Sequence, residues 1–275
     1  RKSNSYRPIG KILDERSFVN AIIGLHATGG STNHTLHLPA MAAAAGIKLT
    51  WEDFSDLSNV IPLLTRIYPN GSADVNQFHA AGGLSFVIKE LLENGLLDGS
   101  AASVWGKTIK DYASEPILKD GKLEWRAAPP NSSDLSILRP INKPHQPNGG
   151  LKMLSGNLGK AVIKISAVSE NNRVITAPAQ VFSNEADVKI AYNKGKLNKN
   201  VVVVVLAQGP QANGMPELHS LTPILANLQD KGFKVALVTD GRMSGASGKI
   251  PAAIHVFPEA VNGGNIGRIK NGDII

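Results

Sequence analysis

Apolar residues recur at helical spacing through much of the first half of the chain. In residues 84–92 they stand at positions 84, 87, 88, 91 and 92, which together make one face of a helix. Residues 36–45 are rich in alanine and leucine, and Gly46 follows as a typical helix stop. We therefore expect residues 14–127 to be mainly helical, with Pro39 kinking its helix or marking its early end.

The second half of the chain changes to short β-rich runs. Residues 161–168 and 174–182 are strand-like, and residues 201–206 form the strongest strand pattern in the chain. Prolines cluster between residues 129 and 150, which is typical of a domain boundary or a long connection. We therefore predict an α/β chain of two domains, residues 1–130 and residues 131–275.

One strand–helix–strand unit is predicted in more detail. Residues 201–206 and 234–238 are expected to be strands, with a helix over residues 217–231 that Gly232 ends. So short a span implies a right-handed parallel crossover.

In such a crossover the loops after both strands open at the same edge of the sheet. Residues 208–217 and residues 240–249 should therefore face one crevice, which brings Glu217 near Ser244.

Composition narrows the class of protein. The 275 residues include 42% hydrophobic residues and no cysteine, which excludes disulfides, thiolate catalysis and cysteine-held metal clusters within this segment. The net charge is +7, but the lysines are scattered, so we expect attraction for anionic substrates and no nucleic-acid binding. No apolar run is long enough to cross a membrane, and we expect a cytoplasmic protein.

The loop at residues 238–249 (VTDGRMSGASGK) has the makeup of an oxyanion site. Its glycines let the backbone approach a ligand, and Arg242 and Lys249 carry positive charge. Ser244 and Ser247 are turn serines on the simpler interpretation; on the other, Ser244 is a base or nucleophile that needs activation. Arg242 is equally suited to a structural ion pair.

Glu217 and residues 28–34 (TGGSTNH) also have two interpretations each. Glu217 is either a carboxylate favoured by a helix dipole or a ligand for Mg²⁺, and spacing alone favours the first. Ser31 and Asn33 begin a helix and either cap it or offer hydroxyl and amide groups to an anion. His34, three residues before another histidine, is a weak metal signal.

Residues 27–38 and residues 238–249 together resemble the dihydroxy-acid/6-phosphogluconate dehydratase family. Three features are similar to its phosphogluconate branch: His34 after an asparagine, the YPNG and FHAAGG segments within residues 68–83, and GKIPAAIHV at residues 248–256. The resemblance spans nearly the whole chain.

The resemblance implies an N-terminal doubly wound α/β domain, of which residues 1–130 are the helical remainder. A swivelling β-barrel-like domain with a parallel crossover is then expected in residues 131–275. The family also implies a homodimer that carries a 4Fe-4S cluster and, in some branches, Mg²⁺.

The implied reaction is that of a hydro-lyase, which removes water from a 2,3-dihydroxy acid to give a 2-keto-3-deoxy acid. In this branch the substrate is 6-phospho-D-gluconate, in the Entner–Doudoroff pathway. By the resemblance, Ser244 matches the serine that removes the proton at C2, and Glu217 matches a carboxylate that binds Mg²⁺. Candidate contacts for the anionic sugar-acid phosphate are, on charge and placement, Arg242, Ser247, Lys249, Ser31 and Asn33.

The sequence also departs from the family. Pro39 replaces an aliphatic residue, no cluster cysteine is present, and the family pattern continues beyond Ile275. We therefore expect a fragment of a larger enzyme that, expressed alone, binds no cluster and has no dehydratase activity. The alternatives are a dehydratase of another sugar acid or dihydroxy acid, and a non-catalytic module that binds a sugar-acid phosphate.

Overall fold

The computed structural model describes residues 6–68, 70–105, 107–243 and 249–275. The chain forms two units that interrupt one another in sequence: Arg1–Gly30 with Leu36–Gly150, and Ser31–Thr35 with Leu151–Ile275. We refer to them as unit 1 and unit 2. No helix among the described residues is long and apolar enough to cross a membrane.

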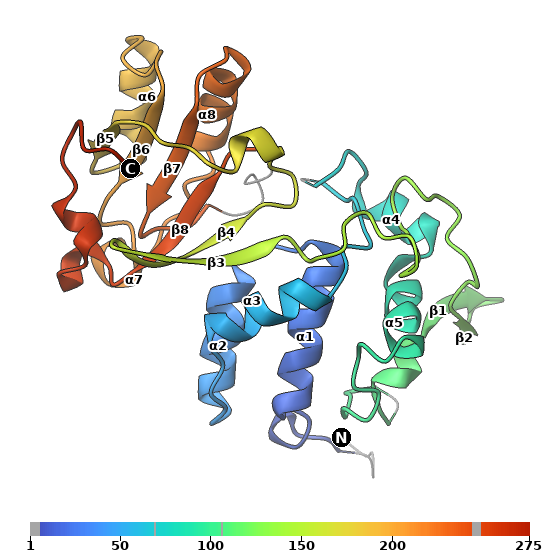
Figure 1. The fold of residues 1–275 in the computed structure, drawn as a ribbon. Helices are drawn as coiled ribbons and strands as arrows, with labels where there is room; N and C mark the ends of the chain where they lie inside the picture. The colour runs from blue at the N-terminus through green and yellow to red at the C-terminus, as the bar shows by residue number, and fades with distance from the viewer. Residues whose placement is uncertain (1–5, 69, 106, 244–248) are drawn as a thin grey trace. The chain divides into compact units, whose positions relative to one another are not determined.

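Unit 1 is built mainly from helices, as expected (Figure 1). Its helices are α1 (Glu15–Thr28), α2 (His34–Ala44), α3 (Trp51–Val60), α4 (Val75–Ala81) and α5 (Gly83–Glu93). On the predicted apolar face of α5, Val87, Ile88 and Leu91 are buried and Leu92 is partly buried, whereas Leu84 is exposed. The helix α2 does not end early at Pro39, because it continues to Ala44 before the left-handed Gly46.

Unit 1 also contains a β-hairpin that the expectation of a helical region missed. Strand β1 (Ser114–Lys119) pairs antiparallel with β2 (Lys122–Ala127). Asp120 and Gly121 connect them with φ values of 50° and 73°, the left-handed pair that a tight two-residue hairpin turn requires. The Asp-Gly dipeptide was therefore the local signal for this hairpin.

Unit 2 contains a six-stranded mixed sheet in the order β3-β4-β8-β7-β6-β5. Its strands are β3 (Leu151–Gly156), β4 (Gly159–Lys164), β5 (Ala179–Phe182), β6 (Val201–Val205), β7 (Val235–Thr239) and β8 (Ala252–Phe257). Strands β5 to β8 pair in parallel and β3 and β4 antiparallel, which confirms the α/β class. The described strands form an open order with β3 and β5 at its edges, and no closed barrel.

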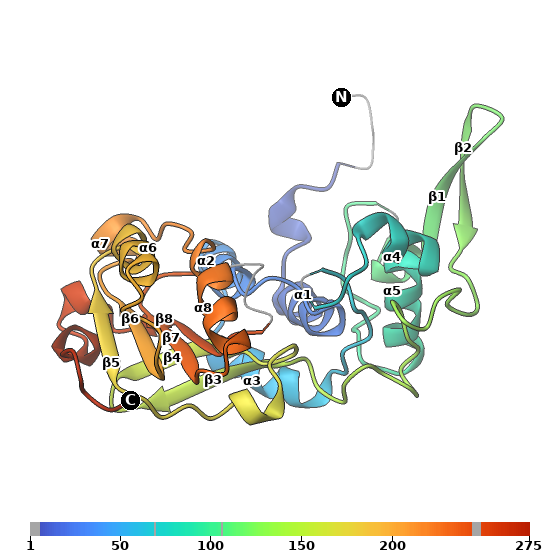
Figure 2. The same ribbon diagram turned by 90° about the horizontal axis from the view of Figure 1, so that it is seen from above.

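Both faces of the parallel strands are buried, which explains the unbroken run of valines in β6. Val201, Val203 and Val205 pack with the helices α6 (Glu185–Asn193) and α8 (Leu221–Asp230), which lie on one side of the sheet (Figure 2). Val202 and Val204 pack into a second cluster on the opposite face. The predicted strand–helix–strand crossover is thus confirmed, with β6 and β7 parallel.

The crossover helix begins later than predicted. After the short α7 (Pro210–Asn213), Gly214 and Met215 both have left-handed φ values, and the helix α8 starts only at Leu221. Glu217 therefore lies in an extended segment that pairs with Arg242, and the prediction that it stands near the helix N-terminus was wrong. A left-handed backbone at Met215 cannot be part of a right-handed helix.

Candidate functional site

The loops after β6 and β7 meet at one edge of the sheet, as the crossover predicted. The carboxylate of Asp240, directly after β7, accepts hydrogen bonds from the backbone N–H groups of Ala207 at 3.2 Å and Gln208 at 2.8 Å. It also accepts one from Ala260 at 3.0 Å. Asp240 is only 1% exposed, so these three bonds form away from solvent. One buried carboxylate thus holds three segments of unit 2 together.

Arg242 and Glu217 lie next to each other on this edge. Their segments form a parallel bridge, and the N–H of Leu218 donates to the carbonyl of Arg242 at 3.1 Å. The guanidinium Nε of Arg242 donates to the carbonyl of Met215 at 2.8 Å and stands 3.7 Å from Glu217 Oε2. The two side chains are 29% and 25% exposed, so an ion pair is held at the surface with its ends open to solvent.

Ser244 and Ser247 lie outside the described residues. The segment that contains them is bounded by two fully buried side chains, Met243 and Ile250. The hydroxyl of Thr222, on α8, lies 3.2 Å from the sulfur of Met243. The chain is therefore anchored in the core on both sides of the two serines.

Lys249 follows this segment and is largely exposed. Its Nζ lies 3.9 Å from Asp230 Oδ1, at the end of α8, and both side chains are 66% exposed. An exposed pair of this kind contributes little to stability. Because the side chain is largely exposed, the ammonium group is accessible to an anion.

Ser31 and Asn33 form a turn that belongs to unit 2. The N–H of Asn33 donates to the hydroxyl of Ser31 at 3.2 Å, so the serine is used locally, as in a capping turn. The side-chain oxygen of Asn33 is buried and has no hydrogen-bond partner among the described residues. The hydroxyl of Thr32, a residue that is 1% exposed, is likewise buried and has no hydrogen-bond partner among the described residues. Buried polar atoms without partners are uncommon in native proteins, so this turn is a candidate place for a ligand or an ordered water molecule.

His255 connects this turn to the loop after β7. The N–H of His255 donates to the carbonyl of Gly241 at 2.9 Å, and its Nδ1 lies 3.2 Å from the hydroxyl of Thr35. Burial first, and then the nearby charge of Arg242, lower the pKa of His255 to about 3, so the ring is neutral at physiological pH. The two sequence motifs are therefore joined inside unit 2.

Two functional candidates were missed by sequence reasoning. Asp240 was part of the loop motif without a role, although an acidic residue directly after a buried strand was a usable signal. His255 was noted only as part of a resembling segment, and no local pattern links it to Thr35.

The described residues contain no group of three histidine, cysteine, aspartate or glutamate side chains that could hold a metal ion. Glu217 supplies one carboxylate, and it faces a guanidinium group at 3.7 Å. His34 and His37 are both exposed, and the ring Nδ1 of His34 lies 2.9 Å from the carbonyl of Ser31. The chain has no cysteine to bind an iron–sulfur cluster.

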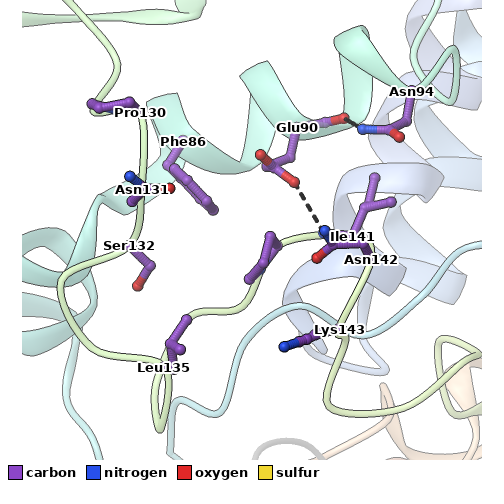
Figure 3. A pocket seen from close by; sticks show the side chains of 11 residues that line it. Phe86, Glu90, Asn94, Pro130, Asn131, Ser132, Leu135, Ile141, Asn142 and Lys143 are labelled. Atoms are coloured by element: carbon purple, nitrogen blue, oxygen red, sulfur yellow. Dashed lines mark hydrogen bonds between the residues drawn. The ribbon is translucent and has the colours of Figure 1, made fainter.

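A separate cavity of about 590 Å³ lies in unit 1 (Figure 3). It is lined by one side of α5 and by the segment that contains Pro130 and Lys143. At its wall the N–H of Ile141 donates to the Glu90 carboxylate at 2.9 Å. None of the candidate site residues lines this cavity, so it is distinct from the sheet edge of unit 2.

Comparison with known proteins gives a consistent match over the chain. The family model described as "Dihydroxy-acid/6-phosphogluconate dehydratase C-terminal" matches residues 136–275, and the corresponding N-terminal model matches residues 2–112. Phosphogluconate dehydratases from Pseudomonas aeruginosa and Rhizobium meliloti are 56% and 58% identical over 99% of this chain. A dihydroxy-acid dehydratase from Sulfurisphaera tokodaii is 41% identical over 96% of it.

The chain spans 45% of the length of each of these three relatives. The match covers both units and includes the two motifs that meet at the sheet edge. The chain therefore belongs to the dihydroxy-acid/6-phosphogluconate dehydratase family.

Proposed function

We propose that this chain is part of a hydro-lyase that dehydrates 6-phospho-D-gluconate to 2-dehydro-3-deoxy-6-phosphogluconate in the Entner–Doudoroff pathway. The observation that carries the proposal is the contrast between relatives. Phosphogluconate dehydratases from several bacteria are 52% to 58% identical to the chain, against 41% for the dihydroxy-acid dehydratase.

The chain contributes an anion-binding edge to this reaction. Arg242 and Lys249 bring two positive charges to the loop after β7, and Arg242 is held in place by the carbonyl of Met215. Asn33 and Ser31 add an amide and a hydroxyl from the turn that His255 ties to the same loop. Ser247 is a further candidate contact, on its position between these cations. A carboxylate and a phosphate on one substrate give such a set two anions to bind.

Ser244 is the proposed base. It removes the proton from C2 of the substrate, the electron pair of that C–H bond forms a double bond to C3, and the hydroxide that leaves C3 combines with a proton equivalent to the one removed, so that water is released. The resulting enol loses its O–H proton and takes up a proton at C3, which gives the 2-keto acid. A serine hydroxyl is a weak base, so it needs a neighbouring group that stabilises its deprotonated form.

The described residues do not fit an iron–sulfur cluster, because the chain has no cysteine. We infer that the 4Fe-4S cluster implied by the family takes its ligands from other parts of the complete protein. Glu217 remains our candidate ligand for Mg²⁺, with further ligands from beyond the described residues. From the same resemblance we infer a homodimer that acts in the cytoplasm.

The test is turnover by the complete protein that contains this chain. We expect 6-phosphogluconate to be dehydrated with a much higher kcat/KM than unphosphorylated gluconate or a branched dihydroxy acid. Preference for either of those would replace the proposed substrate. Binding of 6-phosphogluconate by calorimetry without any turnover would instead indicate a non-catalytic binding module.

The role of Ser244 is tested in the same protein. The substitution Ser244→Ala should lower kcat by at least about 10²-fold, the typical contribution of a general base, with little change in KM. An unchanged kcat would remove Ser244 from the mechanism.

A further inference from the structure

We propose that His255 is a positioning residue that holds the turn at residues 31–35 in register with Gly241 and Arg242 in the loop after β7. The inference rests on the proposed function, since it assigns substrate contacts to the turn and to Arg242. It adds a residue whose side chain and backbone each hold one of the two motifs.

Hydrogen-bond geometry fixes which atom of His255 donates. The hydroxyl of Thr35 lies 2.9 Å from the carbonyl of Thr32, and a carbonyl has no proton, so the hydroxyl must donate there. The same hydroxyl oxygen lies 3.2 Å from Nδ1 of His255 and can then only accept. The proton in this second bond therefore belongs to Nδ1.

The environment keeps the ring in this form. His255 is 3% exposed, and burial together with the charge of Arg242 holds its pKa near 3. A neutral imidazole has one N–H, so with the proton on Nδ1 the Nε2 atom is an acceptor. His255 thus gives the turn a fixed donor that does not change between pH 5 and pH 8.

The backbone at the same residue supplies the second connection. The N–H of His255 donates to the carbonyl of Gly241 at 2.9 Å, one residue before Arg242. His255 has a left-handed φ of 58°, which is rare for a residue with a side chain and costs about 1–3 kcal/mol where it occurs. Such a conformation persists only where surrounding contacts hold it, and two of these contacts, to Thr35 and Gly241, lead to motif segments.

The arrangement predicts a defined energetic coupling. If Thr35 and His255 act through one hydrogen bond, losing either partner shifts the turn relative to the loop. A misplacement of about 1 Å between two sets of substrate contacts is sufficient to lower a rate by about 10²-fold. Since both substitutions remove the same hydrogen bond, removing both partners should cost less than the product of the two single losses.

The experiment is a double-mutant cycle in the complete protein. The variants are Thr35→Val, which keeps the shape without the hydroxyl, His255→Phe, which keeps a ring without the donor, and the double variant. We expect each to lower kcat by about 10²-fold with a smaller change in KM, and the double variant to lose clearly less than the product of the two single losses. If the fold-losses in kcat of the two single variants multiply in the double variant, the inference is overturned.

Conservative variants separate positioning from general packing. Thr35→Ser retains the hydroxyl, and His255→Asn places an amide N–H near the position of Nδ1 while tolerating the left-handed φ. Both should retain kcat within about tenfold of the wild type, the cost of a displaced outer contact. Equal losses of kcat in Thr35→Ser and Thr35→Val would overturn the inference. If His255→Phe fails to fold, this comparison still tests the inference, because Thr35 lies away from the strained backbone of His255.

A second readout does not depend on the substrate. Amide hydrogen exchange in the complete protein should be faster in Thr35→Val than in Thr35→Ser for the peptides that cover residues 31–35 and 239–243. Equal exchange would overturn the inference. A wild-type protein that turns over another sugar acid would instead overturn only the proposed function, and the cycle would then be measured on that substrate.

Discussion

The buried carboxylate of Asp240 allows a quantitative prediction about how the candidate site is held. The substitution Asp240→Ala removes the acceptor of three backbone N–H groups, at Ala207, Gln208 and Ala260. A buried donor that loses its acceptor costs about 1–3 kcal/mol, so three such donors should cost at least about 3 kcal/mol. The carboxylate is 1% exposed, and water replaces it poorly.

The substitution Asp240→Asn should cost less. One oxygen of Asp240 accepts from Gln208, and the other accepts from both Ala207 and Ala260. If the asparagine oxygen still accepts hydrogen bonds from Ala207 and Ala260, its NH₂ group points toward the N–H of Gln208. One donor is then unsatisfied, for about 1–3 kcal/mol.

Native-state hydrogen exchange of the complete protein measures these costs locally. Because each 1.4 kcal/mol corresponds to a factor of ten, the amides of residues 205–212 should exchange about 10²-fold faster in Asp240→Ala than in the wild type. Asp230→Asn is the matched control, because it makes the same charge change at a side chain that is 66% exposed, and it should cost no more than about 0.5 kcal/mol.

The order of the three variants is the critical result. We expect the protection of residues 205–212 to fall from Asp230→Asn to Asp240→Asn to Asp240→Ala. Exchange in Asp240→Ala that matches the control would refute the reasoning, because it would mean that the three hydrogen bonds do not restrain these loops.

Three further predictions follow from other parts of the chain. The unfolded chain protonates His255 near pH 6.5 and the folded chain only near pH 3, so its contribution to stability is complete above pH 6.5 and is lost as the pH falls toward 3. His255→Asn should therefore lose less stability between pH 7 and pH 4 in denaturant unfolding, and an equal loss would contradict the burial of a neutral ring. Gly149→Ala would place a Cβ atom 2.5 Å from Cβ of His26 and should destabilise by about 1–3 kcal/mol in thermal unfolding, whereas Gly24→Ala on α1, with nothing within 4 Å, should not destabilise. The purified 275-residue chain, which has no cysteine, should show no iron–sulfur absorbance after reconstitution with iron and sulfide, and such absorbance would show that other side chains hold a cluster.

The elements that could be predicted from the sequence are those with strong local patterns. The helix α5 has an apolar face with most of its positions buried, and β6 consists of five consecutive buried valines. Because the sequence between β6 and β7 has a helical pattern, their parallel pairing was also predicted, and with it the meeting of the two loops. Local sequence therefore predicted the edge on which the candidate site lies.

The elements that were missed depend on competition between local and distant interactions. Pro216 and Glu217 are suited to a helix start, but the backbone there pairs with Arg242, and Met215 is left-handed. The position of Glu217 was wrong for that reason. The contact between Thr35 and His255 could not be predicted, because no periodicity relates two residues so far apart in the chain.

That separation also affects how the protein is made. Thr35 and His255 are 220 residues apart, and the segment containing Thr35 belongs to the unit formed mainly by the later half of the chain. At synthesis rates of about 5–20 residues per second, the early segment emerges from the ribosome about 10–40 s before β8 exists to receive it. During that interval Thr32 and Thr35 have no sheet to pack against, so the turn cannot yet reach its folded position. We therefore expect the second unit to complete its folding only after β8 has been synthesised.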